Sequence, residues 1–310
     1  TKENNTMIKN KSIVAICVAT YMRQSLLKNC LASIAKIKVP KNYLPVVIVV
    51  DNDKNKSGEV SFNSFKNNYD IEFFYYVEPE RGISSARNCL LEKAILHDAN
   101  LIGFIDDDEF AHENWLLNMV KGIEEYQVDI AAGPVIATYE TSAPKSFERD
   151  KKNTRGATPR NIAAGNVLFK SELAKSCSLR FDRYFDFMGG EDFDFFSKAK
   201  KLGMKSVWLD DAIIFETITS DRRKLKYIIY RHFTGGINLV MRYRKDNSLI
   251  AAWCRYLPKM IGKLLSAIVS LITAMLFLNK SDLKKGLIRL ANGVGYLFGL
   301  TNIIIERYKY

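Results

Sequence analysis

Short apolar runs that alternate with segments of helical spacing constrain the fold more than any other feature of this chain. The runs are rich in β-branched and aromatic residues, and they cover residues 12–19, 44–53, where the run ends in acid, 71–77 and 101–105. Segments with helical spacing of apolar residues separate them at residues 25–37 and 82–99. Buried strands joined by helices are typical of a parallel sheet with right-handed crossovers. The pattern therefore predicts an α/β fold whose ligands lie beyond the carboxyl ends of the strands.

The composition agrees with one α/β domain and an appendage. The chain has 310 residues, of which 47% are hydrophobic and 26% charged, so it can bury a core. Five scattered cysteines include no CxxC pair, which favours reduced thiols over a zinc site or a disulfide framework. The polar residues 1–11 lack the apolar segment of a secretory signal. We expect them to form a disordered leader before a domain at residues 12–220.

The run LIGFI leads directly into four acids, Asp106, Asp107, Asp108 and Glu109. Neighbouring carboxylates repel each other, so a divalent cation would stabilise this strand end. Mg²⁺ and Mn²⁺ prefer oxygen ligands and are commonly held by one or two carboxylates together with phosphates and water. The acids therefore indicate a metal-diphosphate site. The alternative is a solvated acidic turn before a helix near residues 112–115.

A second acidic group follows two glycines in MGGEDFDFF, residues 188–196. Glycines let the backbone approach a ligand closely, and a carboxylate in a cleft can act as general base on a hydroxyl. Glu191, Asp192 and Asp194 also fall in the first turn of a predicted helix, where acids complement the helix dipole. The residues alone leave both interpretations open.

Polar residues near the other strand ends are candidates for holding a nucleotide. Thr20, Tyr21 and Arg23 follow the first strand in VATYMR, and Asp51 ends the second strand. Arg87 carries a charge that can pair with phosphate. Taken singly, each of these residues also fits an ordinary strand end, helix start or surface position.

The basic charge of the chain is confined to its last third. The net charge is +12, and residues 221–310 hold 17 Lys/Arg against 4 Asp/Glu, so the other 220 residues sum to about −1. This region also contains apolar stretches at residues 257–278 and 286–305. An anionic membrane surface and a nucleic acid are the two partners that such a balance suggests. The basic residues flank apolar stretches rather than exposed aromatics, which disfavours nucleic acid.

The longer apolar stretch, residues 257–278, is open to three interpretations. A helix of 22 residues spans about 33 Å, close to the ~30 Å hydrocarbon core of a bilayer. Lys259 and Lys263 leave only residues 264–278 without a charge, so we favour helices that lie in the membrane interface. A true span and a helix packed on a soluble domain are the alternatives.

The order of the motifs resembles that of glycosyltransferase family 2, and in particular of its succinoglycan-type glucosyltransferases. Besides the stretches above, the matching motifs are EPERGISSARN, GPV, GNVLF and RHFTGG, and the resemblance covers roughly residues 12–240. It implies the GT-A fold, a mixed, mostly parallel sheet flanked by helices. It also implies transfer from a nucleotide-diphospho-sugar with inversion. YRHFTGG stands where processive members carry QxxRW, which favours a single addition over polymerisation.

The resemblance implies roles in binding the donor. Thr20, Tyr21 and Asp51 match positions that hold the nucleobase, typically uracil. Arg23 and Arg87 belong to matching motifs and are expected to bind the nucleotide-sugar.

The resemblance also implies roles for the two acidic groups. Asp106 and Asp107 match positions near the ribose and diphosphate. Asp108, together with Asp106, matches the acids that bind Mn²⁺ or Mg²⁺. Asp192 matches the general base, and Glu191 beside it is expected to orient the acceptor or its loop.

The expected reaction is the metal-dependent transfer of one sugar, with glucose favoured, from a UDP-sugar to a hydroxyl of a lipid-linked saccharide or surface-glycan precursor. Such acceptors belong to bacterial polysaccharide or lipopolysaccharide assembly. We therefore expect the basic, apolar region 221–310 to associate with the cytoplasmic face of the inner membrane, and we expect no nucleic-acid partner. The alternative is a non-catalytic nucleotide-sugar-binding scaffold. The intact Asp108 and Asp192 argue against it, because a scaffold has no use for a base.

Overall fold

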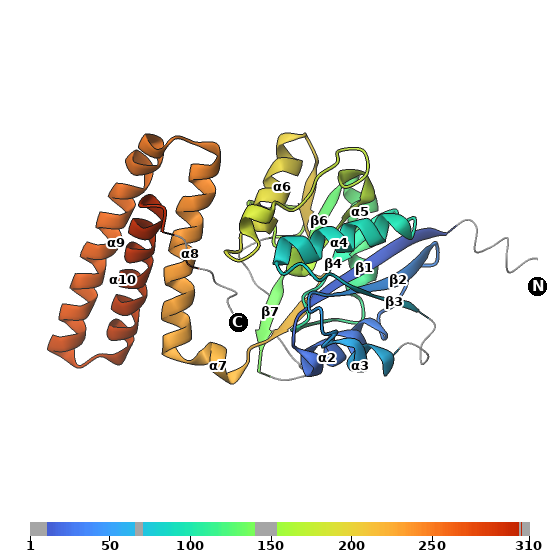
Figure 1. Ribbon diagram of the computed structural model, residues 1–310, viewed down its shortest axis with the longest axis horizontal. Helices are drawn as coiled ribbons and strands as arrows, with labels where there is room; N and C mark the ends of the chain where they lie inside the picture. Colours follow the sequence, from blue (N-terminus) through green and yellow to red (C-terminus); the bar gives the residue numbers. More distant parts are fainter. Residues whose placement is uncertain (1–10, 66–70, 140–153, 304, 306–310) are drawn as a thin grey trace, which may run out of the picture. The chain divides into compact units, whose positions relative to one another are not determined.

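A computed structural model describes residues 11–65, 71–139, 154–303 and 305. The chain forms two compact units (Figure 1). The first contains residues up to 186 and residues 191–217, and the second contains residues 187–190 and those from 218 onward. The predicted leader, residues 1–11, lies outside the described residues except for Lys11.

The first unit is built on a seven-stranded sheet with the order β3-β2-β1-β4-β8-β6-β9. Its strands are β1 (Ser12–Thr20), β2 (Tyr43–Asp51), β3 (Glu72–Val77), β4 (Leu101–Phe104), β6 (Ile130–Ala132), β8 (Val167–Lys170) and β9 (Ser206–Trp208). The first four strands are parallel, whereas β8 is antiparallel to both of its neighbours. The prediction of a mixed, mostly parallel α/β sheet is confirmed.

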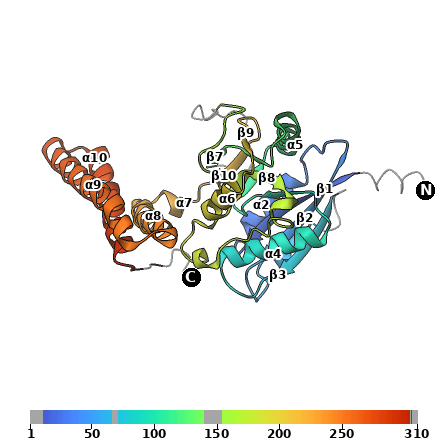
Figure 2. The ribbon, with the colours of Figure 1, turned by 90° about the horizontal axis from the view of Figure 1, so that it is seen from above.

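Helices cover both faces of this sheet (Figure 2). They are α2 (Gln24–Ile34), α3 (Glu59–Asn63), α4 (Ile83–Leu96), α5 (Trp115–Tyr126) and α6 (Glu191–Lys201), with short 3-10 turns η1 (Ala164–Asn166), η2 (Ser171–Leu173) and η3 (Arg183–Phe185). Successive residues of β1 point to opposite faces. Ile16 therefore packs in the layer of α2 and α5, whereas Cys17 packs in the layer of α4 and α6. Both faces are buried, which explains why the strands read as continuous apolar runs.

A small second sheet has the strand order β5-β10-β7. Its strands are β5 (Glu109–Ala111), β7 (Val135–Thr138) and β10 (Ile214–Thr217). The apolar stretch at residues 129–139 contributes to both sheets, because β6 ends before Gly133 and β7 begins after Pro134. A Cβ at Gly133 would collide with the carbonyl oxygen of Ala212, so this close crossing requires glycine.

The register of the parallel strands brings three loops to one edge of the large sheet. Thr20 lies opposite Asp51 in the pair of β1 and β2, and Cys17 lies opposite Phe104 in the pair of β1 and β4. The loops after β1, β2 and β4 therefore begin side by side. Most of the candidate residues from the sequence follow these strand ends.

The second unit is helical. Its helices are α7 (Ser220–Arg223), α8 (Leu225–Asp246), α9 (Leu249–Phe277) and α10 (Lys280–Leu300). The unit resumes at residue 218, three positions before the predicted boundary at residue 221. α10 packs against both α8 and α9. A Cβ at Gly295 would collide with the carbonyl oxygen of Phe233, so the close packing of α10 on α8 requires glycine there.

Helix α9 is longer than the apolar stretch predicted at residues 257–278. It begins at Leu249, where the Ser248 side chain accepts a hydrogen bond from the amide of Ala251 over 3.2 Å, and Pro258 lies inside it. Hydropathy shows where the uncharged, apolar segment begins. The capping residue shows where the helical hydrogen bonds begin, and the two positions need not coincide. The helix therefore begins eight residues before the apolar stretch.

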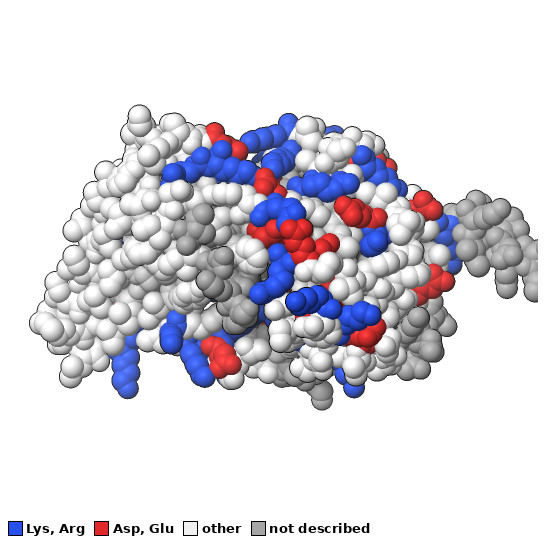
Figure 3. All heavy atoms as spheres, in the orientation of Figure 1, with Lys and Arg blue, Asp and Glu red and all other residues white. Residues whose placement is uncertain are grey.

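One face of α9 is apolar and exposed. Its exposed large side chains are Leu249, Ile250, Leu257, Ile261, Leu265, Ile268, Val269, Ile272, Met275, Leu276 and Phe277. In Figure 3, the area that α9 and α10 occupy is almost without charged side chains, and Lys and Arg lie at its margins. Among the described residues, α9 alone is long and apolar enough to cross a membrane. Its length and hydropathy suit a span, and its one-sided exposure suits a helix in the interface.

Candidate active site

The acidic turn after β4 is closed by Glu109. The amide of Asp106 donates to Glu109 Oε2 over 2.8 Å, and the amide of Glu109 donates back to the Asp106 carbonyl over 3.0 Å. Glu109 is buried, and Gly165 leaves room for it, since a Cβ at that position would collide with the carboxylate. Burial raises the pKa of Glu109 well above its usual value. Glu109 therefore shapes the turn that carries Asp106, Asp107 and Asp108.

The loop after β1 joins the acidic turn through Asp107. Thr20 Oγ1 donates to Asp107 Oδ2 and Arg23 Nη1 donates to Asp107 Oδ1, both over 2.9 Å. Arg23 Nη1 also lies 3.4 Å from Asp108 Oδ2. Burial raises the pKa of Asp107 to about 6, and the Arg23 charge opposes that rise. The structure thus brings together four predicted site residues from segments that are 84 to 87 positions apart.

Arg87 joins the acidic turn to the second acidic group. It lies in the first half of α4, and its side chain is buried. Its Nη2 lies 3.1 Å from Asp106 Oδ1, and its Nη1 forms an ion pair with Glu191 Oε1. One guanidinium therefore holds two carboxylates of the site. The sequence motif did not indicate these contacts, and a role of Arg87 toward the donor stays a prediction.

Glu191 and Asp192 open α6, in the first turn that the sequence predicts. Burial raises the pKa of both carboxyl groups, and the Arg87 charge opposes the rise. Glu191 Oε2 is buried and has no hydrogen-bond partner among the described residues. Asp192 is partly exposed, and its Oδ1 accepts from the amide of Phe193 over 2.7 Å. A carboxylate with a raised pKa that a solute can reach is suited to accept a proton near neutral pH.

Asp51 is fully buried at the end of β2. Its Oδ2 accepts from the Gly58 amide and the Tyr75 hydroxyl, each over 2.6 Å, and its Oδ1 accepts from the Asp53 amide over 3.1 Å. These bonds shape the loop 52–58. The predicted contact of Asp51 with a nucleobase stays a prediction. The position of Asp51 at a strand end did not indicate that it also holds this loop.

Tyr21 connects the loop after β1 with the loop before α4. The guanidinium carbon of Arg81 lies 4.8 Å from the centroid of the Tyr21 ring. A cation over an aromatic face is attracted by the ring quadrupole. The ring is partly exposed. The contact brings a basic side chain to the predicted nucleobase position.

The acids of the turn fit a divalent metal that takes most of its ligands from phosphate and water. Within the described ranges, no group of three or more His, Cys, Asp or Glu side chains is placed to hold an ion. Metal sites beside a diphosphate need only one or two carboxylates from the protein. Asp106, whose side chain is 42% exposed, and Asp108 are the two that fit. Asp107 has both oxygens bonded to Thr20 and Arg23.

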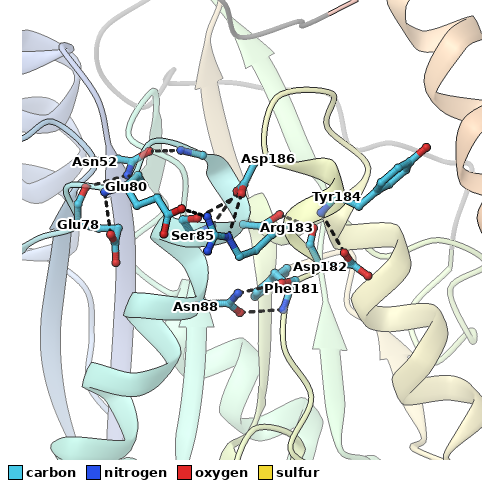
Figure 4. Close-up of polar contacts among 12 residues, drawn as sticks. Asn52, Glu78, Glu80, Ser85, Asn88, Phe181, Asp182, Arg183, Tyr184 and Asp186 are labelled. Carbon is cyan, nitrogen blue, oxygen red and sulfur yellow. Dashed lines mark hydrogen bonds and ion pairs between the residues drawn. The ribbon is translucent and has the colours of Figure 1, made fainter. Parts of the chain in front are cut away.

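A polar network joins residues of the EPERGISSARN motif to the segment before α6 and holds that segment against α4 (Figure 4). Asp186 Oδ1 accepts from the Ser85 amide over 2.9 Å, and its Oδ2 accepts from the Ser85 hydroxyl over 3.2 Å. Arg183, in the same segment, forms an ion pair with Glu80. Ser85 and Asp186 are 101 positions apart, so local spacing carries no signal for this contact.

Two asparagines complete this network (Figure 4). Asn88 donates to the carbonyl of Phe181 and accepts from its amide, each over 2.8 Å. Asn52 accepts from the Gly82 amide over 2.8 Å and donates to the Glu80 carbonyl over 2.7 Å. The network therefore ties together the loop after β2, the start of α4 and the segment that leads to α6.

Comparison with known proteins gives a matching family and relatives, among them one that aligns over most of both chains. The sequence model described as Glycosyl transferase family 2 matches residues 15–181. The succinoglycan biosynthesis protein ExoM of Rhizobium meliloti is 28% identical over 228 residues, and the alignment covers 72% of each chain. This similarity extends beyond the residues that the family model matches.

Solved structures that share the fold include the following two. The mannosyltransferase PcManGT from Pyrobaculum calidifontis, solved with GDP-Man and Mn²⁺, has a TM-score of 0.63 at 16% identity over 94% of this chain and 88% of that chain. Residues 1–349 of S. aureus TarS, solved with UDP-GlcNAc, have a TM-score of 0.52 at 18% identity over 73% of this chain and 66% of that chain. At sequence identities this low, the similarity supports a shared fold and nothing about the activity of this chain. Together with the sheet topology, it confirms the GT-A fold.

Proposed function

The chain belongs to glycosyl transferase family 2, and from this we propose that it is an inverting, metal-dependent enzyme that transfers one sugar from a UDP-sugar to a hydroxyl group. One observation carries the proposal: Arg87 joins the acidic turn at Asp106 to Glu191, next to Asp192. The first acidic group suits a metal-diphosphate. The second suits a base. A transferase needs both, whereas a binding scaffold needs only the first.

Asp192 is the base in this proposal. It takes the proton from the acceptor hydroxyl while that oxygen bonds to the anomeric carbon. The bond from this carbon to the diphosphate oxygen breaks, and its electron pair leaves with UDP. Attack from the face opposite the leaving group inverts the configuration. Glu191, which Arg87 holds, orients the acceptor or its loop.

The remaining site residues bind the donor in this proposal. Thr20, Tyr21 and Asp51 lie at the ends of β1 and β2 and are assigned to the nucleobase. Asp108 and Asp106 would hold Mn²⁺ or Mg²⁺. The ion, when bound, neutralises charge on the leaving diphosphate.

The acceptor that we propose is a lipid-linked saccharide or surface-glycan precursor at the cytoplasmic face of the bacterial inner membrane. Three observations support it. Helix α9 exposes an apolar face, the region 221–310 is strongly basic, and the relative ExoM is named for succinoglycan biosynthesis. An apolar face rimmed by Lys and Arg is suited to an anionic bilayer.

Calorimetric binding of UDP, GDP, CDP and dTDP, each with Mn²⁺ and with EDTA, tests the donor site. The neighbours were solved with UDP-GlcNAc and GDP-Man, so the comparison must include both nucleotides. We expect UDP to bind with Mn²⁺ and to lose most of its affinity with EDTA. Binding of GDP in preference to UDP would overturn the choice of donor. Binding of none of the four would overturn the donor site itself.

A further inference from the structure

Helix α4 contacts both ends of the loop that precedes the proposed base. The loop, residues 187–190, follows Asp186 and leads into Glu191. The Asp186 side chain bonds to Ser85 in the first turn of α4, and Glu191 pairs with Arg87 two residues further along the same helix. The two anchor points of the loop are therefore set by one rigid element.

The loop between these anchors has an unusual backbone. Gly189 and Gly190 have φ values of +80° and +99°, which residues with a side chain rarely adopt. Such a loop has few intrinsic constraints, because glycine populates many backbone conformations. The direction in which α6 begins, and with it the position of Asp192, therefore depends on how the loop is held, both at its flanks and at the Met188 carbonyl, which accepts from Asn238.

Asp186 also serves as the N-terminal cap of α4. The helix has Gly82 at its own N-cap position, and glycine offers no side chain to the first-turn amides. Asp186 supplies the missing acceptors: its carboxylate bonds to the amide and hydroxyl of Ser85, and its carbonyl accepts from the Ile83 amide over 3.2 Å. A carboxylate at this end also complements the helix dipole.

The space for this cap depends on Gly82. Its φ is +149°, and a Cβ there would collide with the Asp186 carboxylate. Asp186 is buried, and Arg183 Nε lies 3.4 Å from its Oδ2. Figure 4 shows the Asp186 side chain directed at Ser85 and Arg183. The carboxylate is therefore fixed from several sides.

We propose that Asp186 is a positioning residue for Glu191 and Asp192. By capping α4 it fixes the start of the loop 187–190, while Arg87 of the same helix fixes its end through Glu191. The assignment of Asp192 as the base rests on the proposed function. The capping contact and its effect on the loop do not.

Hydrogen–deuterium exchange on the full chain tests the positioning directly. We compare the wild type with Asp186→Ala, which removes the cap, and Asp186→Asn, whose amide oxygen can still accept from Ser85. Asp186→Ala is expected to exchange faster in peptides 83–88 and 187–193, with β1 and β2 unchanged. Asp186→Asn is expected to restore most of the protection.

Asp182→Ala is the matched control. Asp182 is an acid of the same segment. Its carboxylate caps its own turn by accepting from the Tyr184 amide over 2.9 Å, and it lies 3.7 Å from Nζ of Lys198 in the second half of α6, away from the loop 187–190. Its loss is expected to loosen residues 183–185 and to leave exchange at 187–193 unchanged. Equal loosening of 187–193 in both alanine variants would overturn a specific role for Asp186.

The turnover number kcat is a second measurement. It should not change if Asp186 only stabilises α4 and does not position Asp192. With the UDP-sugar that binding selects and a lipid extract of bacterial membranes as acceptor, kcat of Asp186→Ala should fall about tenfold to a hundredfold because the base is misplaced. KM for the UDP-sugar should stay within about twofold, and Asp186→Asn should recover most of kcat. An unchanged kcat, or unchanged exchange at 187–193, would overturn the proposal. A wild type that binds no nucleotide and transfers no sugar would instead refute the proposed function, and exchange would still decide whether Asp186 holds the segment.

Discussion

Arg87 Nη2 lies 3.1 Å from Asp106 Oδ1, and this contact links helix α4 to the acidic turn. The other terminal nitrogen of Arg87 pairs with Glu191. A single buried cation thus balances carboxylates from two acidic groups that the sequence places 85 positions apart. The first prediction below follows from this arrangement.

Arg87→Ala is expected to lower the free energy of unfolding by about 3 kcal/mol, because it leaves the buried Glu191 carboxylate without its partner. Urea unfolding followed by tryptophan fluorescence measures the change. Lys38→Ala is the control, since Lys38 pairs with Glu113 where both side chains are more than half exposed. Its loss should be much smaller. Equal losses in the two variants would contradict the buried role of Arg87.

Asp192→Asn is expected to reduce transfer by about 10²–10⁴-fold, because an amide cannot take the acceptor proton. UDP binding should be unchanged, since the substitution preserves the shape of the side chain. Asp194→Asn is the matched control in the same helical turn, where Asp194 pairs with Lys198 over 2.6 Å. Radiolabelled sugar transfer and calorimetry measure the two effects. Normal turnover in Asp192→Asn would remove Asp192 as the base.

Asp108→Asn is expected to weaken UDP binding in Mn²⁺ and to have little effect in EDTA. The substitution would remove one of the two protein carboxylates that bind the metal, while the diphosphate would still supply most of the ligands. Titration of UDP in both buffers measures the difference between them. An affinity in Mn²⁺ equal to that of the wild type would refute the metal assignment.

The acid limb of the pH–rate profile is expected to lie above pH ~4, the ordinary pKa of an aspartate. Burial raises the pKa of Asp192, so its carboxylate becomes protonated, and useless as a base, while the pH is still above that value. The Arg87 charge lowers this pKa. Arg87→Gln should therefore move the limb to higher pH. If the acid limb of the pH–rate profile lies at the same pH in Arg87→Gln as in the wild type, protonation of Asp192 does not cause it.

Binding to anionic vesicles is expected to be strong at low salt and to weaken as salt rises, because each Lys or Arg near the surface contributes about 1 kcal/mol. Ile268→Asp, on the exposed face of α9, should reduce binding sharply, since it places a charged side chain among the acyl chains of the lipid. Val60→Asp is the control, because Val60 is also apolar and is 75% exposed, against 53% for Ile268, but lies in α3 of the first unit. Vesicle co-sedimentation measures both variants. Equal binding by Ile268→Asp and the wild type would contradict a membrane role for α9.

Several elements could be predicted because their signal is local. The strands β1 and β2 follow from continuous apolar runs, and the acidic first turn of α6 follows from the letters of MGGEDFDFF. The start of α9 could not be predicted from hydropathy, because the helix extends past Arg255 to the Ser248 cap. Hydropathy reports which residues avoid water, and helix ends depend on which backbone groups find a partner.

The sequence by itself determined the α/β alternation, the family and the identity of the candidate acids, because each of these depends on residue type and local order. Only the tertiary structure decided what the side chains contact. Arg23 meets Asp107 across 84 positions, Asp186 meets Ser85 across 101, and Arg87 meets Glu191 across 104. These pairs form because strand register and helix docking bring distant loops to one edge of the sheet. A charge that is taken out of water there must find its partner in space rather than along the chain.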